Sequence, residues 1–120
     1  MARKQRHADS LNDILALLET TRAECGQRGC IVRIWSPAGT RLDIGVGAAA
    51  SFLQFIRSDE DSYLITVGDR LLEGVEAFYL DGHHMEIPRR NLIAREDARK
   101  AVAVFFETSA MPTNVTWEEV

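Results

Sequence analysis

Residues 30–46, CIVRIWSPAGTRLDIGV, form the stretch that decides the fold of this chain. Residues 30–35 are rich in β-branched and aromatic side chains, which favour strands. Ser36-Pro37-Ala38-Gly39 follows, with proline and glycine at positions where turns use them. Residues 40–46 again have the composition of a strand. The stretch therefore predicts a β-hairpin.

A second strand pair is expected directly downstream. Residues 51–57 fit either a short strand or a helical segment, because Phe52 and Ile56 have helical spacing. We favour the strand, since residues 63–67 resemble its hairpin partner. The charged stretch between them, Ser58-Asp59-Glu60-Asp61, is then a turn.

A third pair is expected around Asp81-Gly82, a common hairpin turn. Residues 76–80 and 83–87 flank it. Pro88 then ends the second strand or places it at a sheet edge, because proline donates no ladder hydrogen bond.

Helices are expected at both ends of the chain. Ser10 and Asp13 form an acidic variant of the capping box, and the first helix should run to about Glu24, before Gly26 and Gly29. The second helix starts at Arg95-Glu96-Asp97 and ends near Thr108. Apolar side chains recur at helical spacing in both: Leu11, Ile14, Leu15 and Leu18 in the first, and Ala98, Ala101, Val102 and Phe105 in the second.

The order of elements predicts an α+β fold. A short strand at residues 115–118 completes a largely antiparallel sheet of about five to seven strands, with an N-terminal and a C-terminal helix packed on one face. We expect residues 1–120 to be a single domain, with residues 1–9 as a flexible tail.

Composition narrows the function classes. The 120 residues are 46% hydrophobic and 27% charged, with a formal net charge of −4. Nucleic-acid binders usually carry a basic excess, and here the basic cluster is Arg3 to His7 at the terminus. No apolar run reaches the roughly 18–20 residues that cross a bilayer, and no secretory signal is visible. We expect a cytoplasmic protein that binds neither nucleic acid nor membrane.

The two cysteines, Cys25 and Cys30, are interpreted as ordinary thiols. Structural zinc usually takes four ligands, and no second pair accompanies this C-x4-C spacing. A reducing cytoplasm disfavours a disulfide.

Other motifs are better explained by packing than by chemistry. Residues 45–50, GVGAAA, match a loose dinucleotide fingerprint, but no crossover helix follows, so a softened strand end is expected. His83 and His84 are neighbours on a strand and point to opposite faces, so one should be exposed and the other packed. Trp35 and Trp117 are each either a core residue or an exposed anchor, and we favour the core. We expect no enzyme activity, no cofactor and no metal.

Two acidic clusters are the candidate partner-binding residues: Asp59, Glu60, Asp61, Glu118 and Glu119. Most such clusters are solvated charge. The functional alternative is a contact for a basic protein partner.

The last third of the chain resembles the immunity-protein family numbered one of bacterial polymorphic toxin systems. The resemblance rests on residues 78–88 (FYLDGHHMEIP), 92–102 (LIAREDARKAV), 105–112 (FFETSAMP) and 115–117 (VTW). Residues 45–47 and 64–69 also resemble the corresponding parts of this family. The family usually has Thr-Gly before the late proline, where this chain has Thr108-Ser109-Ala110. The resemblance implies structural roles for the motif residues Pro88, Ala101, Phe105 and Trp117.

The resemblance also implies a partner, a cognate toxin encoded beside this chain. Toxins beside this family are often nucleic-acid deaminases, which admit a nucleotide to a zinc pocket. A protein covering that channel would neutralise the toxin without chemistry of its own. The alternatives are a non-toxin interaction module or assembly subunit, and a small-ligand binder or enzyme.

Overall fold

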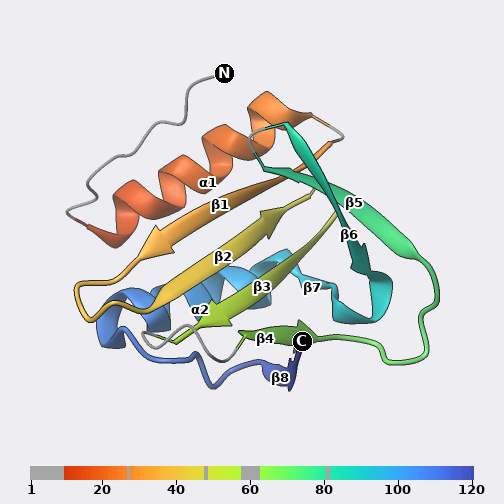
Figure 1. Cartoon of the computed structure of the whole chain (residues 1–120). Coiled ribbons are helices and arrows are strands. Elements are labelled where there is room, and N and C mark those ends of the chain that lie inside the picture. Colours follow the sequence, from red (N-terminus) through yellow and green to blue (C-terminus); the bar gives the residue numbers. More distant parts are fainter. Residues whose placement is uncertain (1–9, 27, 48, 58–62, 81) are drawn as a thin grey trace.

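The computed structural model describes residues 10–26, 28–47, 49–57, 63–80 and 82–120. Its elements follow the predicted order of helix, strands, helix and strand (Figure 1). Their bounds are α1 (Leu11–Cys25), β1 (Gly29–Trp35), β2 (Arg41–Val46), β3 (Ala50–Ile56), β4 (Tyr63–Val67), β5 (Val75–Leu80), β6 (His83–Pro88), the 3-10 turn η1 (Arg89–Asn91), β7 (Ile93–Ala94), α2 (Arg95–Thr108) and β8 (Thr116–Glu119).

Helix α1 begins and ends as its sequence predicts. The Ser10 hydroxyl accepts a hydrogen bond from the backbone N–H of Asp13 at 3.2 Å, which satisfies one free donor of the first turn. Gly26 follows the last residue with φ of 62°, and its N–H donates to the Arg22 carbonyl. A residue with a Cβ is strained in that backbone conformation, so glycine ends the helix there.

The sheet is mostly antiparallel, as predicted. Strands β1, β2, β3 and β4 pair in sequence order, and β8 pairs with the outer side of β4. The structure adds two features. The β5–β6 hairpin joins β1 through a short parallel contact, Gly29 with Phe78 and Cys30 with Tyr79. The two-residue strand β7 pairs with the start of β3 and makes an eighth strand.

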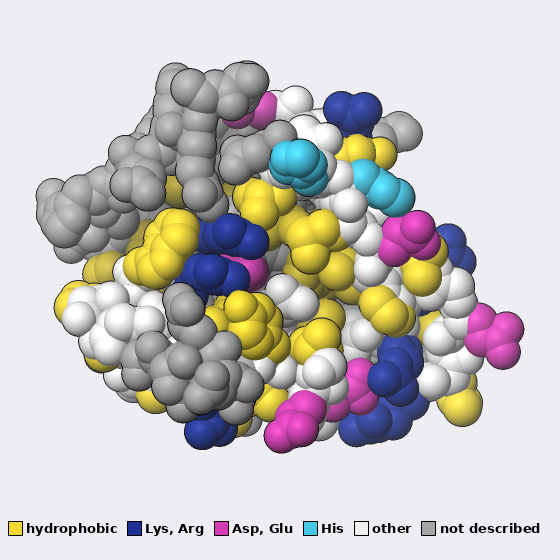
Figure 2. Space-filling view, in the orientation of Figure 1, with side chains coloured by type: hydrophobic (Ala, Val, Ile, Leu, Met, Phe, Trp, Pro, Cys, Tyr) yellow, Lys and Arg dark blue, Asp and Glu magenta, His cyan; other side chains and the backbone are white. Residues whose placement is uncertain are grey.

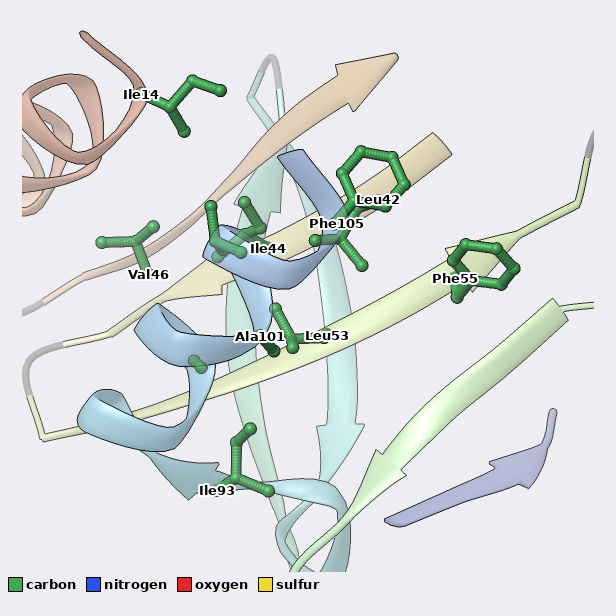
Figure 3. Packing of buried hydrophobic residues seen from close by; sticks show 11 residues of the cluster. Ile14, Leu42, Ile44, Val46, Leu53, Phe55, Ile93, Ala101 and Phe105 are labelled. Atoms are coloured by element: carbon green, nitrogen blue, oxygen red, sulfur yellow. The ribbon is translucent and has the colours of Figure 1, made fainter. Parts of the chain in front are cut away.

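Both helices pack on one face of the sheet, as predicted. Figure 3 shows Ile14 of α1 and Phe105 of α2 directed toward Leu42, Ile44 and other side chains of β2 and β3. This main core buries the alternate apolar residues of the central strands. We estimate that each fully buried leucine, isoleucine or phenylalanine side chain contributes about 1.5–3 kcal/mol.

A smaller core lies on the opposite face, which the sequence did not predict. The β5–β6 hairpin crosses over one end of that face (Figure 1) and places Phe78 and Ile87 against Ile31 and Phe52. The rings of Phe52 and Phe78 are perpendicular, with centroids 4.8 Å apart. The hairpin therefore covers only one end of this face of the sheet.

The Gly-rich motif serves this second core. A Cβ on Gly45 would collide with the ring of Phe52, its partner across the β2–β3 ladder. Gly29 leaves room for the ring of Phe78 in the same way. Close ring packing explains these two glycines, whereas the sequence predicted only a softened strand end or bulge at residues 45–50.

The interpretation of the cysteines as free thiols is wrong. Cys25 and Cys30 form a disulfide, with Cα atoms 6.4 Å apart. The glycines at 26 and 29 let the chain reverse between α1 and β1, which brings the two Cα atoms within the range of about 4.4–6.8 Å that disulfides span.

Candidate functional site

Side chains on the face away from the helices lie in three rows that cross the strands. Because residues paired across a ladder point to the same face, the registers define each row. The first row is Trp35, Arg41, Ile56 and Tyr63; the second is Arg33, Asp43, Gln54, Ile65 and Glu118; the third is Ile31, Gly45 and Phe52.

The third row lies under the β5–β6 hairpin, whereas the first row is open at both ends. Trp35 at one end is 50% exposed and Tyr63 at the other is 43% exposed. Figure 2 shows Lys or Arg side chains beside an Asp or Glu near the middle of this face, with hydrophobic side chains around them. We call the first row, together with Arg33, Asp43 and Gln54 of the second row, the open face. Within it Ile56 and Asp43 are only 2% and 3% exposed, and Ile65 of the second row belongs to the smaller core with Phe78 and Ile87.

Arg33, Arg41 and Asp43 form an ionic cluster at the centre of the open face. The Arg41 guanidinium donates to both carboxylate oxygens of Asp43, Nε to Oδ1 at 2.9 Å and Nη2 to Oδ2 at 3.2 Å. Arg33 approaches the same carboxylate from β1, with Nε 3.5 Å from Oδ2. Asp43 is only 3% exposed. A carboxylate can be buried this deeply because two cations compensate its desolvation.

The open face has the composition of a binding hot spot. Tryptophan, tyrosine and arginine are the residues that most often carry the binding energy of protein interfaces. All of them lie on strands here, so little backbone freedom would be lost on binding. The expectation that Trp35 lies in the core is wrong, because the third residue of the Ile31–Arg33–Trp35 alternation extends past the covering hairpin.

Trp117 is partly buried, close to its expected place. It packs against the main core on the other face, with its ring centroid 6.3 Å from that of Phe55. Its indole N–H donates to the Pro112 carbonyl at 2.7 Å. The late proline and the tryptophan of the C-terminal motif are thus joined by one hydrogen bond.

The described structure places only two of the five acidic residues predicted to bind a partner. Asp59, Glu60 and Asp61 lie outside the described residues. Glu118 and Glu119 are neighbours on β8 and point to opposite faces. Glu118 accepts hydrogen bonds from Arg90 at 2.7 Å and from the Asn91 amide at 2.9 Å.

Glu118 therefore stabilises the fold. Its other oxygen lies 3.6 Å from Arg70, and its side chain is 20% exposed. These contacts tie β8 to η1 and to the loop after β4. Glu119 is the exposed member of the pair.

The histidines depart from expectation, because His83 and His84 are both exposed. They stand at the tip of the hairpin, beyond the strands that it covers. The centroids of the His84 and Tyr79 rings are 5.7 Å apart. The guanidinium carbon of Arg28 lies over the Tyr79 ring, 4.6 Å from its centroid. In the described part of the chain, no three His, Cys, Asp or Glu side chains gather as a metal site would require.

A depression of about 450 Å³ lies on the opposite side of the sheet, between α1 and α2. Its floor is apolar and includes Val46 and Val102, and its rim carries the ion-paired Glu19 and Arg22 together with Arg99. The paired rim charges resemble an ordinary solvated helix surface.

Comparison with known proteins decides the family. The family model described as "Immunity protein Imm1" matches residues 2–119. The chain belongs to the Imm1 immunity protein family. The Imm1 match covers nearly the whole chain and so extends the resemblance seen in its last third. A search of curated proteins finds no match to this chain.

The Imm1 motif residues build the fold. Ala101 and Phe105 are buried in the main core, at 0% and 2% exposure. Pro88 is the last residue of β6 and precedes η1. Within the described residues, no helix of this Imm1 protein has the length and apolar character that crossing a membrane requires.

Arg33, Arg41, Asp43 and Tyr63 of the open face were not singled out from the sequence. A signal for them exists in residues 41–46, RLDIGV, where Arg41 and Asp43 alternate with buried apolar residues. That alternation indicates a second face of the strand, on the side of the sheet that the helices do not cover. The Imm1 pattern did not point to it, because the motif residues mark the fold.

Proposed function

We propose that this Imm1 protein binds and neutralises a cognate toxin domain encoded by a neighbouring gene. The family match over residues 2–119 is the observation that carries the proposal. The open face supports it, because its exposed aromatic side chains and partly buried arginines suit a protein partner. Neutralisation by contact needs no catalytic residue, so we propose a non-catalytic protein.

Occlusion is the mechanism that we propose. If the toxin is a nucleic-acid deaminase, its target base must enter a zinc pocket through an open channel. A domain docked over that channel stops turnover. We place this complex in the cytoplasm, where the toxin meets its target.

The experiment has two parts. The C-terminal toxin domain of the neighbouring gene is expressed with and without this chain, and cell survival is counted. The purified pair is then analysed by size-exclusion chromatography with light scattering, and toxin turnover is measured against added Imm1 protein. We expect rescue, a stoichiometric complex and inhibition that saturates at that stoichiometry.

Two results would contradict the proposal. Cells that die at the same rate with or without this chain would exclude neutralisation. A stable complex with a toxin that stays fully active would exclude occlusion and favour an assembly subunit.

A further inference from the structure

The disulfide lies at the point where the β5–β6 hairpin is attached to the rest of the sheet (Figure 1). Among the described residues, the parallel ladder between β1 and β5 consists of two residue pairs, Gly29 with Phe78 and Cys30 with Tyr79. Cys30 is one end of the disulfide, and the other end, Cys25, is the last residue of α1. The bond therefore ties the attachment point of the hairpin to a helix that packs on the main core.

The two residues before Cys30 contact the hairpin as well. The guanidinium carbon of Arg28 lies 4.6 Å from the centroid of the Tyr79 ring, and the Arg28 backbone N–H donates to the carbonyl of the last α1 residue at 3.1 Å. Gly29 lies so close to the Phe78 ring that a Cβ there would collide with it. Three consecutive residues thus contact the hairpin, and the disulfide constrains their position.

Loss of the disulfide should weaken this attachment and leave the fold intact. Helix α1 is held on the sheet by Ile14, which is buried in the main core, and by Leu15 and Leu18, which pack against it. The loop that the bond closes is short, with a sequence separation of 5, so the bond restricts the unfolded chain less than a long-range disulfide does. Its loss therefore acts locally, on the residues of β1 that contact the hairpin.

Both cysteines are placed within reach of a small thiol. Cys25 and Cys30 are partly exposed, and neither belongs to the hydrophobic clusters of the described chain. In reducing compartments such as the cytoplasm, where we place this protein, disulfides are rare, and those that occur are usually transient, catalytic or redox-sensing. The Cys25–Cys30 bond matches a redox-sensing disulfide, because it is accessible and its loss spares the core.

We propose that the Cys25–Cys30 disulfide is a reversible redox switch that sets how firmly the β5–β6 hairpin is held on β1. The reductant is a small thiol of the glutathione class. In the oxidised protein the hairpin is fixed, and in the reduced protein it opens more often. This switch goes beyond toxin binding and does not depend on it.

The reaction is an ordinary thiol–disulfide exchange. A glutathione thiolate attacks one sulfur of the bond, forms a mixed disulfide with that cysteine and releases the other cysteine as a thiolate, which takes up a proton. A second glutathione thiolate attacks the mixed disulfide and releases the remaining cysteine thiol together with oxidised glutathione. Two electrons pass from two thiols to the protein disulfide, and oxidised glutathione reverses the reaction.

The redox equilibrium of the native protein is the first measurement. The protein is held at graded ratios of reduced to oxidised glutathione and quenched with an alkylating reagent, and mass spectrometry counts the alkylated cysteines. We expect reversible reduction within the range of the cytosolic glutathione poise, with an unchanged far-ultraviolet circular dichroism spectrum. A bond that stays oxidised in excess reduced glutathione until denaturant is added would be a purely structural disulfide and would overturn the switch.

Hydrogen exchange followed by mass spectrometry locates the effect. Reduction should speed exchange of the backbone amides of β5 and of the first residues of β1 at least about fivefold, because these amides exchange through local opening of the hairpin. The amides of β3 and α2 should exchange at the same rate in both forms. Unchanged exchange in β5 would contradict control of the hairpin by the bond, and equal acceleration in β3 and α2 would show a global loss of stability instead.

The variant Cys25→Ser/Cys30→Ser is the matched control. It should exchange like the reduced wild-type protein at every glutathione ratio, since it has no bond to break. Exchange in this variant that still follows the glutathione ratio would place the effect elsewhere, and a variant that does not fold would contradict the local role of the bond. None of these measurements uses the toxin, so a failed switch and a failed neutralisation are told apart.

Discussion

Ser109 has a strained, left-handed backbone conformation. It follows α2 with φ of 57° and ψ of 10°, and its N–H donates to the Phe105 carbonyl at 2.8 Å. Among the described non-glycine residues it is the one with positive φ. Its carbonyl accepts a hydrogen bond from the Thr40 hydroxyl at 2.7 Å, so its position is held from the β1–β2 turn as well. The family usually has glycine after the threonine here, and this conformation explains why.

Replacing Ser109 with glycine should therefore stabilise the protein. We expect Ser109→Gly to raise the free energy of unfolding by about 0.5–1 kcal/mol, since relief of left-handed strain exceeds the extra freedom of the unfolded chain. Urea denaturation measures the change. Ala110→Gly, one residue further on, is the control and should not stabilise. Equal gains at both positions would show that backbone strain is not the cause.

A buried polar network is the second feature at this scale. The Thr66 hydroxyl accepts from the Leu53 N–H at 3.1 Å and donates to the Asn91 carbonyl at 3.0 Å. The Asn91 side-chain amide donates to the Thr66 carbonyl and to Glu118, both at 2.9 Å. Asn91 is 2% exposed. The network joins β3, β4, η1 and β8, so it holds the edge of the sheet next to the open face.

Removing Asn91 should cost more than removing an exposed asparagine. Asn91→Ala leaves the Thr66 carbonyl without this donor, and we expect a loss of about 1–3 kcal/mol in unfolding free energy. Asn114 bonds the Asp97 carbonyl at the surface, and Asn114→Ala should lose less than about 0.5 kcal/mol. Chemical denaturation of both variants gives the comparison. Similar losses in the two would contradict a structural role for the buried network.

At the scale of elements, the disulfide joins the end of α1 to the start of β1. It closes a short loop, because Cys25 and Cys30 are only 5 residues apart. The strand that it anchors carries Arg33 and Trp35 of the open face. Hydrophobic packing of Ile14 and its neighbours already holds α1 on the sheet. The disulfide should thus add to a fold that forms without it.

Reduction should lower stability without unfolding the protein. We expect the Cys25→Ala/Cys30→Ala variant to lose about 2 kcal/mol, the loop-entropy value for so short a loop, and to keep its circular dichroism spectrum. Thiol labelling of the untreated protein should find no free thiol in either cysteine, and labelling in intact cells reports the state in the compartment. An unfolded double variant would contradict this account of α1.

At the scale of the whole molecule, charge is distributed unevenly. The chain is acidic overall, yet the open face carries the two arginines of the Arg33–Asp43–Arg41 cluster. The acidic residues Asp59, Glu60 and Asp61 follow β3 in the sequence, and Glu119 is exposed on β8. We propose that these four acids contact basic residues of the toxin around the open face. Glu118 is left out because it holds β8 to η1.

Long-range charge affects association more than final affinity. The triple variant Asp59→Asn/Glu60→Gln/Asp61→Asn should slow association with the toxin several-fold at low salt, and the difference should shrink near 0.5 M salt as charges are screened. Stopped-flow fluorescence measures the rates. Glu73→Gln/Glu86→Gln/Glu107→Gln removes the same charge from exposed sites elsewhere. Equal slowing by the two triple variants would assign the effect to net charge alone.

Local patterns were sufficient to predict most elements. Ser10 and Gly26 bound the first helix as expected, and the turn at 36–39 joins β1 to β2. Such features depend on residues close in sequence, whose conformations are set by backbone sterics and hydrogen bonds within one turn. The apolar stripes of both helices predicted their common face. The sequence also carried the family motif, because that motif encodes the fold.

Contacts between distant residues were decided only in the tertiary structure. The parallel contact of Phe78 with Gly29, the burial of Asn91 and the placing of Trp35 at the surface depend on how the β5–β6 hairpin crosses the sheet. No local pattern specifies that crossing, since its energy comes from packing between segments about 50 residues apart in the chain. The open face exists for the same reason, as the part of the sheet that neither the helices nor this hairpin covers.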